Sequence, residues 1–374
     1  MAFFVQFRYS TAMDPIFVPY LEKIECALRT ALPAQENSAW LHASFAQLPD
    51  GAAYEHTANL TEPCRALINL GGKRWRPLLM TLCAQAAREC GKADGQPLSE
   101  NALYSLTPLV EFVHTASLIH DDIEDRAEVR RGQPCAYVRY GLDTALNAGS
   151  WLYFEAATCI PQLDADCAFK TALYSLYAEE LRRLHLGQAM DIAWHRDASY
   201  FPSLAEYSAM VRCKTGTLSA LAARLGVTAG GGCGEMCAEA GKIAASLGEG
   251  FQILDDVQNL TAGNAGKQRG DDIVEGKKSL PVLLHLQEHP SDAASLMRFM
   301  ETAAREGIAS QSVERCIALL ESGGAIGKAE ETGRRLIENG SRQLSELFCG
   351  GKTAGAQLIQ QLFADLLLSF QKTA

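Results

Sequence analysis

The sequence predicts an all-α protein built as a bundle of long antiparallel helices. Two long stretches, residues 101–129 and 235–260, carry apolar residues three and four positions apart, which is the spacing of one helix face. No run alternates polar and apolar residues in the way that predicts a strand. Breakers of regular structure recur at roughly 20 to 40 positions, a separation that favours long helices joined by short connections.

The breakers are short clusters of glycine, proline and small polar residues. They lie at residues 91–97, 199–203, 230–234, 263–270, 289–291 and 323–324. The first 60 residues or so show weaker patterning than the rest and carry no recognisable motif. We therefore expect a helical bundle with a less regular N-terminal part.

Composition and charge exclude several classes of protein. The chain has 374 residues, of which 48% are hydrophobic and 21% charged, so it can bury a large core. Its net charge of -10 argues against a nucleic-acid partner, which would need clustered positive charge. We expect no transmembrane segment, because no stretch is long and apolar enough to span a bilayer.

The cysteines and the N-terminus predict a cytoplasmic protein. The 12 cysteines are scattered without a C-x-x-C pair, which argues against a zinc site. The N-terminal MAFFVQFRYS lacks the basic start and the full hydrophobic segment of a secretory signal. Scattered cysteines without such a signal are typical of reduced residues.

The first feature that suggests chemistry is an acidic cluster, LIHDDIED, at residues 118–125. On a helix, Asp121 and Asp125 lie one turn apart on the same face, with Asp122 beside them. These like charges repel, so a positive group must compensate them. Oxygen ligands without a nearby His or Cys pair suit Mg²⁺, which often bridges to substrate phosphate.

A charge run more often marks a solvated helix end than a metal site. Here, however, the acids are followed by the adjacent arginines Arg130 and Arg131, and arginine is suited to bidentate phosphate contacts. Acids for a metal, followed by paired arginines, suggest a diphosphate site.

A second cluster about 130 residues further on repeats the pattern. Asp255, Asp256 and Asn259 occupy the same i, i+1, i+4 positions, and Gln252 lies one turn earlier. Asn259 offers a neutral carbonyl oxygen in place of a carboxylate. A polar helix end is again the alternative, but Gln252 and Asp255 sit in an apolar run and would need buried partners, which a metal supplies.

Basic residues occur in three further segments. Lys73 and Arg76 follow two glycines before an apolar helix, an arrangement that exposes backbone N–H groups to an anion. Lys214 with Thr215, and Lys277 after the second acidic cluster, add two more cationic positions. Taken singly, each is more often an exposed loop charge.

Together and in this order, the motifs resemble the trans-isoprenyl (polyprenyl) diphosphate synthase family. The matching segments are GGKRWRP, HTASLIHDDIEDRAEVRRGQP, KTGTL, GEGFQILDDVQNL and GDDIVEGKKSLP, over roughly residues 65–345. DDIED, TALNAGSWLYF, LHLGQAMDIAWH and the DDxxN form of the second cluster resemble the eukaryotic-type geranylgeranyl diphosphate synthases. The resemblance implies the isoprenoid synthase fold, in which long helices surround a central catalytic cavity, and an enzyme that works as a homodimer or a larger homo-oligomer.

The resemblance also implies a role for each matching residue. It assigns Mg²⁺ binding to Asp121, Asp125, Asp255, Asp256 and Asn259. Catalytic roles fall to Asp121, Asp122, Asp125, Lys214, Asp255 and Asp256. Lys73, Arg76, His114 and Arg131 would hold isopentenyl diphosphate, and Arg130, Lys214, Thr215, Gln252 and Lys277 would meet the allylic diphosphate. Ala116 and Ser117, small residues one turn before the first acids, would leave room for a long product.

The expected reaction is the magnesium-dependent, head-to-tail addition of isopentenyl diphosphate to an allylic diphosphate. The primer would be dimethylallyl, geranyl or farnesyl diphosphate, and the expected product is geranylgeranyl diphosphate. Residues 61–374 would form the catalytic domain, with residues 1–60 as an N-terminal helical extension. A longer polyprenyl product is the main alternative, and a terpene cyclase or a non-catalytic synthase subunit are weaker ones, because the isopentenyl diphosphate residues and the first acids are all present.

Overall fold

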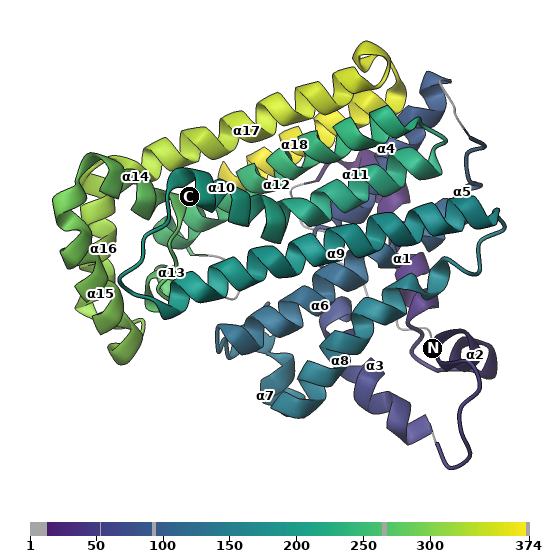
Figure 1. Cartoon of the computed structure of the whole chain (residues 1–374), viewed down its shortest axis with the longest axis horizontal. Helices are drawn as coiled ribbons and strands as arrows, with labels where there is room; N and C mark the ends of the chain where they lie inside the picture. Colours follow the sequence, from purple (N-terminus) through teal and green to yellow (C-terminus); the bar gives the residue numbers. More distant parts are fainter. Residues whose placement is uncertain (1–12, 53, 92–94, 264–267, 372–374) are drawn as a thin grey trace.

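The computed structural model describes residues 13–52, 54–91, 95–263 and 268–371, and over these residues it confirms the all-α prediction (Figure 1). Its α-helices are α1 (Val18–Ala31), α2 (Ser38–Phe45), α3 (Tyr54–Asn69), α4 (Trp75–Cys90), α5 (Glu100–Ser105), α6 (Pro108–Glu124), α7 (Ala136–Tyr140), α8 (Leu142–Glu155), α9 (Cys167–Arg196), α10 (Leu204–Val211), α11 (Thr217–Ala229), α12 (Gly234–Thr261), α13 (Asp271–Val274), α14 (Leu280–Glu288), α15 (Ala293–Glu306), α16 (Gln311–Ser322), α17 (Ala325–Leu347) and α18 (Ala354–Gln371). A π-helical turn, Arg212–Gly216, joins α10 to α11.

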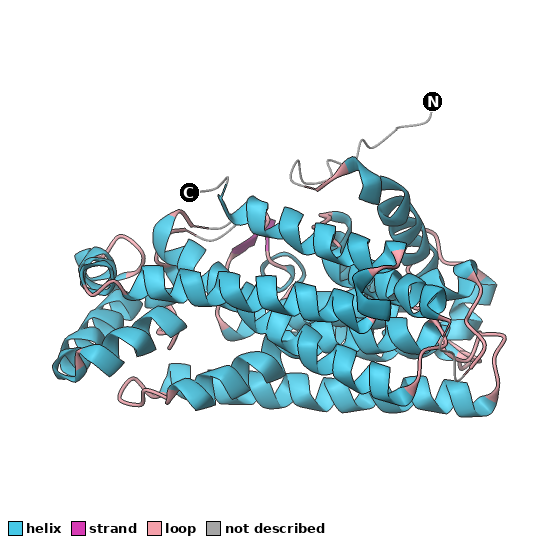
Figure 2. Ribbon diagram, turned by 90° about the horizontal axis from the view of Figure 1, so that it is seen from above, coloured by secondary structure: helices cyan, strands magenta, loops and turns pink. Residues whose placement is uncertain are grey.

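The long helices run side by side along the longest axis of the molecule (Figures 1 and 2). α12 lies centrally and packs most extensively against α17 and α11, while α11 also packs on α4, and α6 on α8. The two strands, β1 (Val129–Arg130) and β2 (Gln133–Pro134), form one small antiparallel hairpin after α6.

The helix ends follow from local sequence. Asp166 accepts a hydrogen bond of 2.7 Å from the backbone N–H of Phe169 and so starts the 30-residue α9. Ser203 and Glu206 form a reciprocal capping box at the start of α10. The predicted breakers fall between α-helices, apart from Gly234, which is the first residue of α12; residues 92–94 and 264–267, which belong to two of them, lie outside the described residues.

The stretch at residues 101–129, expected as one helix, is divided in the structure. α5 ends at Ser105 and α6 begins at Pro108, because proline fixes φ and removes an N–H, which suits the first turn of a helix. α6 ends at Glu124, and Arg126 adopts a positive φ of 57° that no α-helix can continue. The acidic cluster therefore lies at the very C-terminus of α6.

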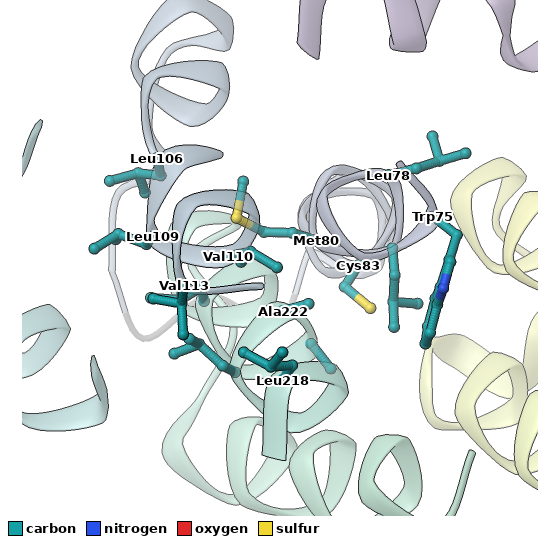
Figure 3. Packing of buried hydrophobic residues seen from close by; sticks show 14 of the residues in the cluster. Trp75, Leu78, Met80, Cys83, Leu106, Leu109, Val110, Val113, Leu218 and Ala222 are labelled. Carbon is teal, nitrogen blue, oxygen red and sulfur yellow. The ribbon is translucent and has the colours of Figure 1, made fainter. Parts of the chain in front are cut away.

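One large core joins most of the helices. Figure 3 shows a part of it, where α4, α6 and α11 contribute the labelled side chains Leu78, Met80, Cys83, Leu109, Val110, Val113, Leu218 and Ala222. Phe17 and residues of α1 belong to the same cluster of buried side chains. A second cluster fills the end of the bundle formed by α10, the C-terminal part of α12 and α13 to α17.

Within the described residues, one stretch, Glu100–Glu124, has the length and composition of a membrane-spanning helix. Its mean hydropathy reaches 1.2, and 72% of that window is buried inside the fold. No such stretch was expected from the sequence. The stretch combines α5 and α6, and its burial is typical of a helix in the core of a folded domain.

Gly226 of α11 permits the close approach of α11 to α4. A Cβ at this position would lie 2.3 Å from the carbonyl oxygen of Met80. We expect Gly226→Ala to lower the free energy of unfolding by about 1–3 kcal/mol, because backbone must move to make room. Gly327→Ala on α17, where a Cβ meets nothing within 4 Å, should instead raise it by up to about 1 kcal/mol. Urea unfolding measures both, and equal effects would contradict the packing argument.

Candidate active site

A cavity of about 410 Å³ lies between the N-terminus of α4, the C-terminal half of α6, α9, the π-helical turn and α12. One part of its wall is charged, and the other is apolar and aromatic. The lining residues are Lys73, Trp75, Arg76, His114, Ser117, Leu118, His120, Asp121, Glu124, Arg130, Tyr153, Leu184, His185, Gln188, Lys214, Thr215, Leu218, Phe251, Gln252, Asp255, Lys277, Leu366 and Phe370. Most of the sequence-predicted site residues are thus brought together.

The end of α6 carries the first acidic cluster to this cavity. Asp121 Oδ1 accepts hydrogen bonds of 3.1 Å from Lys214 Nζ and from Gln188 Nε2. Burial and the negative charge of Asp121 raise the pKa of Asp125 to about 7, although Lys277 and Lys214 oppose the rise. The two carboxylates therefore lie close enough to repel each other.

Lys214 reaches the acids from the π-helical turn. Its Nζ lies 2.5 Å from Asp191 Oδ2 and 3.1 Å from Asp121 Oδ1. Burial lowers the pKa of Lys214, but Asp121 and Asp191 outweigh it and hold the pKa above its ordinary value. Gly187 of α9 makes the approach possible, because a Cβ there would lie 2.2 Å from the backbone nitrogen of Lys214. π-helical turns occur often at functional sites.

Asp122 points away from the cavity. Its side chain is buried, and Arg130 Nε and Nη2 each lie 2.6 Å from Asp122 Oδ1. Arg130 borders the cavity, but its charge is already paired. Asp122 therefore ties the hairpin to α6, and its catalytic role remains a prediction that its position does not favour.

The second acidic cluster lies across the cavity on α12. Asp255 borders the cavity, whereas Asp256 is buried and accepts hydrogen bonds from Tyr207 Oη (3.1 Å) and Gln252 Nε2 (2.9 Å). Burial, with the nearby carboxylate of Asp272, raises the pKa of Asp256 to about 7. Gln252 in turn accepts a hydrogen bond of 2.8 Å from Thr215 Oγ1, so α12 is tied to the π-helical turn.

Asn259 and Lys277 belong to the same corner of the molecule. Asn259 is buried away from the cavity, and its Oδ1 accepts the backbone N–H of Asp272 at 3.1 Å. Lys277 borders the cavity and forms ion pairs with Asp272 (2.9 Å) and Glu275 (3.2 Å). Asn259 thus holds the loop that carries Lys277. Its role as a metal ligand stays a prediction that its buried position away from the cavity does not favour.

Two of the predicted isopentenyl diphosphate residues form a basic wall. Lys73 Nζ donates a hydrogen bond of 2.7 Å to Ser369 Oγ of α18. Arg76 lies over the ring of Trp75 at 4.5 Å, and its buried Nε donates to no acceptor in the described part of the chain. Burial lowers the pKa of Arg76 to about 10, so it stays charged at neutral pH. A buried, charged donor of this kind calls for an anion.

His114 completes the basic wall, and Arg131 lies behind it. Burial and the charge of Arg76 hold the pKa of His114 well below its ordinary value, so the ring is neutral at pH 7. Arg131 does not border the cavity, and it donates a hydrogen bond to the carbonyl oxygen of Gly71.

The remaining wall could accommodate an isoprenoid chain. Ser117 and Leu118 of α6 border it, opposite Leu184 and Leu218. At its far side, the ring of Tyr153 lies between the rings of His120 and His185, with centroid distances of 5.5 and 5.3 Å. Ala116 is fully buried and does not border the cavity, so of the two predicted chain-length residues only Ser117 faces it.

The donors present fit a hard divalent cation held jointly with an anionic substrate. Among the described residues, no three His, Cys, Asp or Glu side chains form a ready-made metal cage. The ends of α6 and α12 instead present carboxylate oxygens. Burial, with the charge of Asp121, raises the pKa of Asp125, and a cation bound beside it would oppose that rise. Such a cation keeps open positions for water and phosphate oxygens.

Sequence reasoning missed two polar residues of α9. Gln188 borders the cavity, and Asp191 pairs both with Lys214 and with His195 Nε2 at 2.9 Å. Leu184, Gln188, Asp191 and His195 follow helical spacing, so one face of α9 points to the site. That spacing was the available signal.

Comparison with known proteins gives consistent results. A family model described as polyprenyl synthetase matches residues 57–320. A geranylgeranyl pyrophosphate synthase of Gibberella zeae is 32% identical over 318 residues, which cover 83% of this chain and 74% of that protein. Another, from Metarhizium anisopliae, is 34% identical over 276 residues, covering 73% and 76%.

Solved structures share the fold. The geranylgeranyl pyrophosphate synthetase of Pyrococcus horikoshii aligns with a TM-score of 0.74 and 23% identity, over 93% of this chain and 96% of that one. A polyprenyl synthase of Caulobacter crescentus, complexed with calcium and isoprenyl diphosphate, aligns with a TM-score of 0.73 and 23% identity over 95% of each chain.

The buried carboxyl of Asp256 predicts a pH-dependent stability in metal-free buffer. Unfolded, this group loses its proton near pH 3.9, whereas in the fold its pKa is about 7. The folded state therefore binds more protons between these values, and stability falls as pH rises from about 4 to 7, by at most about 1.4 kcal/mol per pH unit.

We expect Asp256→Asn to flatten this decline, because the amide cannot ionise. Urea unfolding with a chelator at pH 5, 6, 7 and 8 measures it. Asp164→Asn, in an exposed loop, should keep the wild-type slope. A slope unchanged by Asp256→Asn would contradict the raised pKa.

Proposed function

The chain belongs to the polyprenyl synthetase family and is a prenyltransferase, and from this premise we propose that it makes geranylgeranyl diphosphate in a magnesium-dependent reaction. The reaction adds isopentenyl diphosphate head-to-tail to an allylic diphosphate. One observation carries the proposal: a single cavity is lined by a carboxylate from each acidic cluster, Asp121 and Asp255, by a basic wall and by an apolar part. Each part has a different substrate group to meet.

The part of the cavity bordered by Asp121 and Asp255, here called the acidic corner, would bind the allylic diphosphate. Asp121, Asp125 and Asp255 would hold Mg²⁺, with Asp256 behind Asp255. When bound, the metal neutralises the charge that develops on diphosphate as the allylic carbon–oxygen bond breaks. Lys214 and Lys277 lie at the same place and add charge stabilisation, usually the largest catalytic contribution.

The rest of the cavity would serve the carbon chemistry. The apolar lining keeps water from the allylic cation. The double bond of isopentenyl diphosphate attacks the cation and forms the new carbon–carbon bond. The tertiary cation that results then loses a proton from the adjacent carbon to an oxygen of the released diphosphate, and a new double bond forms. No protein base is needed, which agrees with the absence of a Ser-His-Asp or Cys-His arrangement among the residues that line the cavity.

The basic wall favours chain elongation over a terpene cyclase. A cyclase handles one diphosphate, whereas Lys73 and Arg76, with the neutral ring of His114 beside them, form a second cationic region next to the first. The ring of Trp75 and the hydroxyl of Ser369 hold these cations in place. We assign this region to isopentenyl diphosphate.

We further propose that the enzyme is a homodimer joined through α8 and α9. Leu142, Leu146 and Phe154 lie four and eight positions apart on α8 and are 55%, 48% and 77% exposed. Leu186 of α9 is 56% exposed. Large apolar side chains gathered in this way are typical of a protein interface, and a second copy offers the same surface in return.

Asp121→Ala tests the acidic corner. We expect turnover to fall by roughly a hundred- to a thousandfold, because the change removes a carboxylate that faces the cavity. Helix content should persist, since alanine is the best helix former. The assay combines Mg²⁺, isopentenyl diphosphate and each allylic primer, with products sized by mass. Asp164→Ala is the exposed control. Near-normal turnover by folded Asp121→Ala protein would refute the assignment.

Ser117→Phe tests the path of the growing chain. Ser117 borders the cavity one turn before Asp121, and one helical turn of about 5.4 Å is comparable to one isoprene unit. A phenyl ring there should shift the product from twenty toward fifteen carbons. Ser117→Ala should leave the product length unchanged. The proposed path of the growing isoprenoid chain would be contradicted if the Phe variant made products of unchanged length, or if the wild-type enzyme made products of six isoprene units or more.

A further inference from the structure

Arg74 is a buried cation that lies in sequence between Lys73 and Arg76 of the basic wall but does not border the cavity itself. It lies between Lys73 and Trp75, is only 4% exposed, and adopts a left-handed conformation with φ of 49°. That conformation is costly for a residue with a Cβ. The side chain must therefore gain strong contacts to hold it.

Those contacts are two carboxylates and one carbonyl. Arg74 Nε donates to Glu25 Oε1 at 2.7 Å, Nη1 to Glu111 Oε1 at 2.6 Å, and Nη2 to the carbonyl oxygen of Ile68 at 2.6 Å. The side chains of Glu25 and Glu111 are 7% and 5% exposed. All three side chains are buried. Charge-assisted hydrogen bonds are strong and geometrically specific in such a place, because water does not compete with them.

Glu25 comes from a part of the chain outside the family match, which begins at residue 57. It lies on α1, whose apolar residues Leu21, Ile24 and Leu28 are buried in the main core. This packing places the carboxylate of Glu25 against Arg74. Glu111 comes from α6, three residues before His114, so α1 and α6 grip Arg74 from two sides.

The contacts of Arg74 with Glu25 and Glu111 affect the residues that are predicted to bind isopentenyl diphosphate. Arg74 directly follows Lys73 and is the N-cap of α4, on which Arg76 is the second residue. The backbone conformation of Arg74 therefore determines in which direction the side chains of Lys73 and Arg76 point. Glu111 also favours the charged form of Arg76, as the electrostatic contributions to its pKa show.

We infer that Glu25 is a positioning residue for isopentenyl diphosphate, which with Glu111 fixes Arg74 and thereby directs Lys73 and Arg76 into the cavity. The N-terminal helix α1 would thus complete the substrate pocket. The inference rests on the proposed function.

Positioning and simple electrostatics predict opposite results for this residue. Removal of a negative charge near a cationic pocket strengthens anion binding when only the field matters. Loss of positioning weakens anion binding, because the cations no longer converge on the phosphate. The sign of the change therefore separates the two roles.

The test is Glu25→Gln in the full chain. We expect the KM for isopentenyl diphosphate to rise about tenfold, with kcat and the KM for the allylic primer within about twofold of wild type. Calorimetric titration with isopentenyl diphosphate alone should show the same loss of affinity. The matched control is Glu22→Gln, the same change at an exposed position of the same helix, which should behave like wild type.

Glu25→Asp provides a variant that keeps the charge and is milder for folding. It moves the carboxylate by about one methylene, so positioning predicts a raised KM for isopentenyl diphosphate, whereas a field effect predicts none. In an Arg74→Gln background, Glu25→Gln should add little further change if it acts through Arg74.

A lowered or unchanged KM for isopentenyl diphosphate in both Glu25 variants would overturn the inference, even if their melting temperatures fell. Equal rises in both KM values would also overturn it, because they would indicate general disorder of the site. Failure of the proposed function is a distinct result: wild-type protein would then elongate no allylic primer with isopentenyl diphosphate.

Discussion

The attraction between Lys214, Lys277 and the carboxylates around them is the interaction on which the site depends. Two acidic clusters at the ends of buried helices would repel each other and weaken both α6 and α12. Lys214 joins Asp121 to Asp191, and Lys277 pairs with Asp272 near the second cluster. Burial, with the neighbouring carboxylates of Asp121 and Asp272, raises the pKa values of Asp125 and Asp256 to about 7. A divalent cation bound between the two clusters would favour the charged forms of these groups.

Close backbone packing makes these ion pairs possible. Lys214 lies on a π-helical turn that contacts both α9 and α12. Gly187 lets α9 approach the turn, and a Cβ on Gly216 would lie 2.7 Å from the carbonyl oxygen of Ala245 on α12. Glycine at these positions has lower helix propensity than alanine. The tight core on either side compensates for that loss, and it positions Lys214 within reach of two carboxylates.

The sequence predicted the helical class from local spacing, and its resemblance to a known family predicted most of the charged and polar residues that line the cavity. Apolar periodicity defines helices, and the i, i+4 rule brings Asp121 toward Asp125 whatever the rest of the fold does. It could not predict which face of a motif turns inward: Asp122 and Asn259 carry the right chemistry, but hydrogen bonds to Arg130 and to the Asp272 amide draw them away from the cavity. Nor could it place Asp191 or Glu25, whose partners are distant in sequence.

The two cationic regions differ in whether their cations are paired with carboxylates, and this difference agrees with the separate roles proposed for them. Lys214 and Lys277 are paired with carboxylates, so an anion arriving there meets a corner with little net positive charge until a metal joins it. Within the described part of the chain, Lys73 and Arg76 form no ion pair with a carboxylate, and a hydroxyl and an indole ring hold them instead. An anion in the basic wall therefore meets uncompensated cations. Under the proposed function, one diphosphate would thus depend on a metal and the other on the protein alone, and this difference would keep the two substrates in separate places.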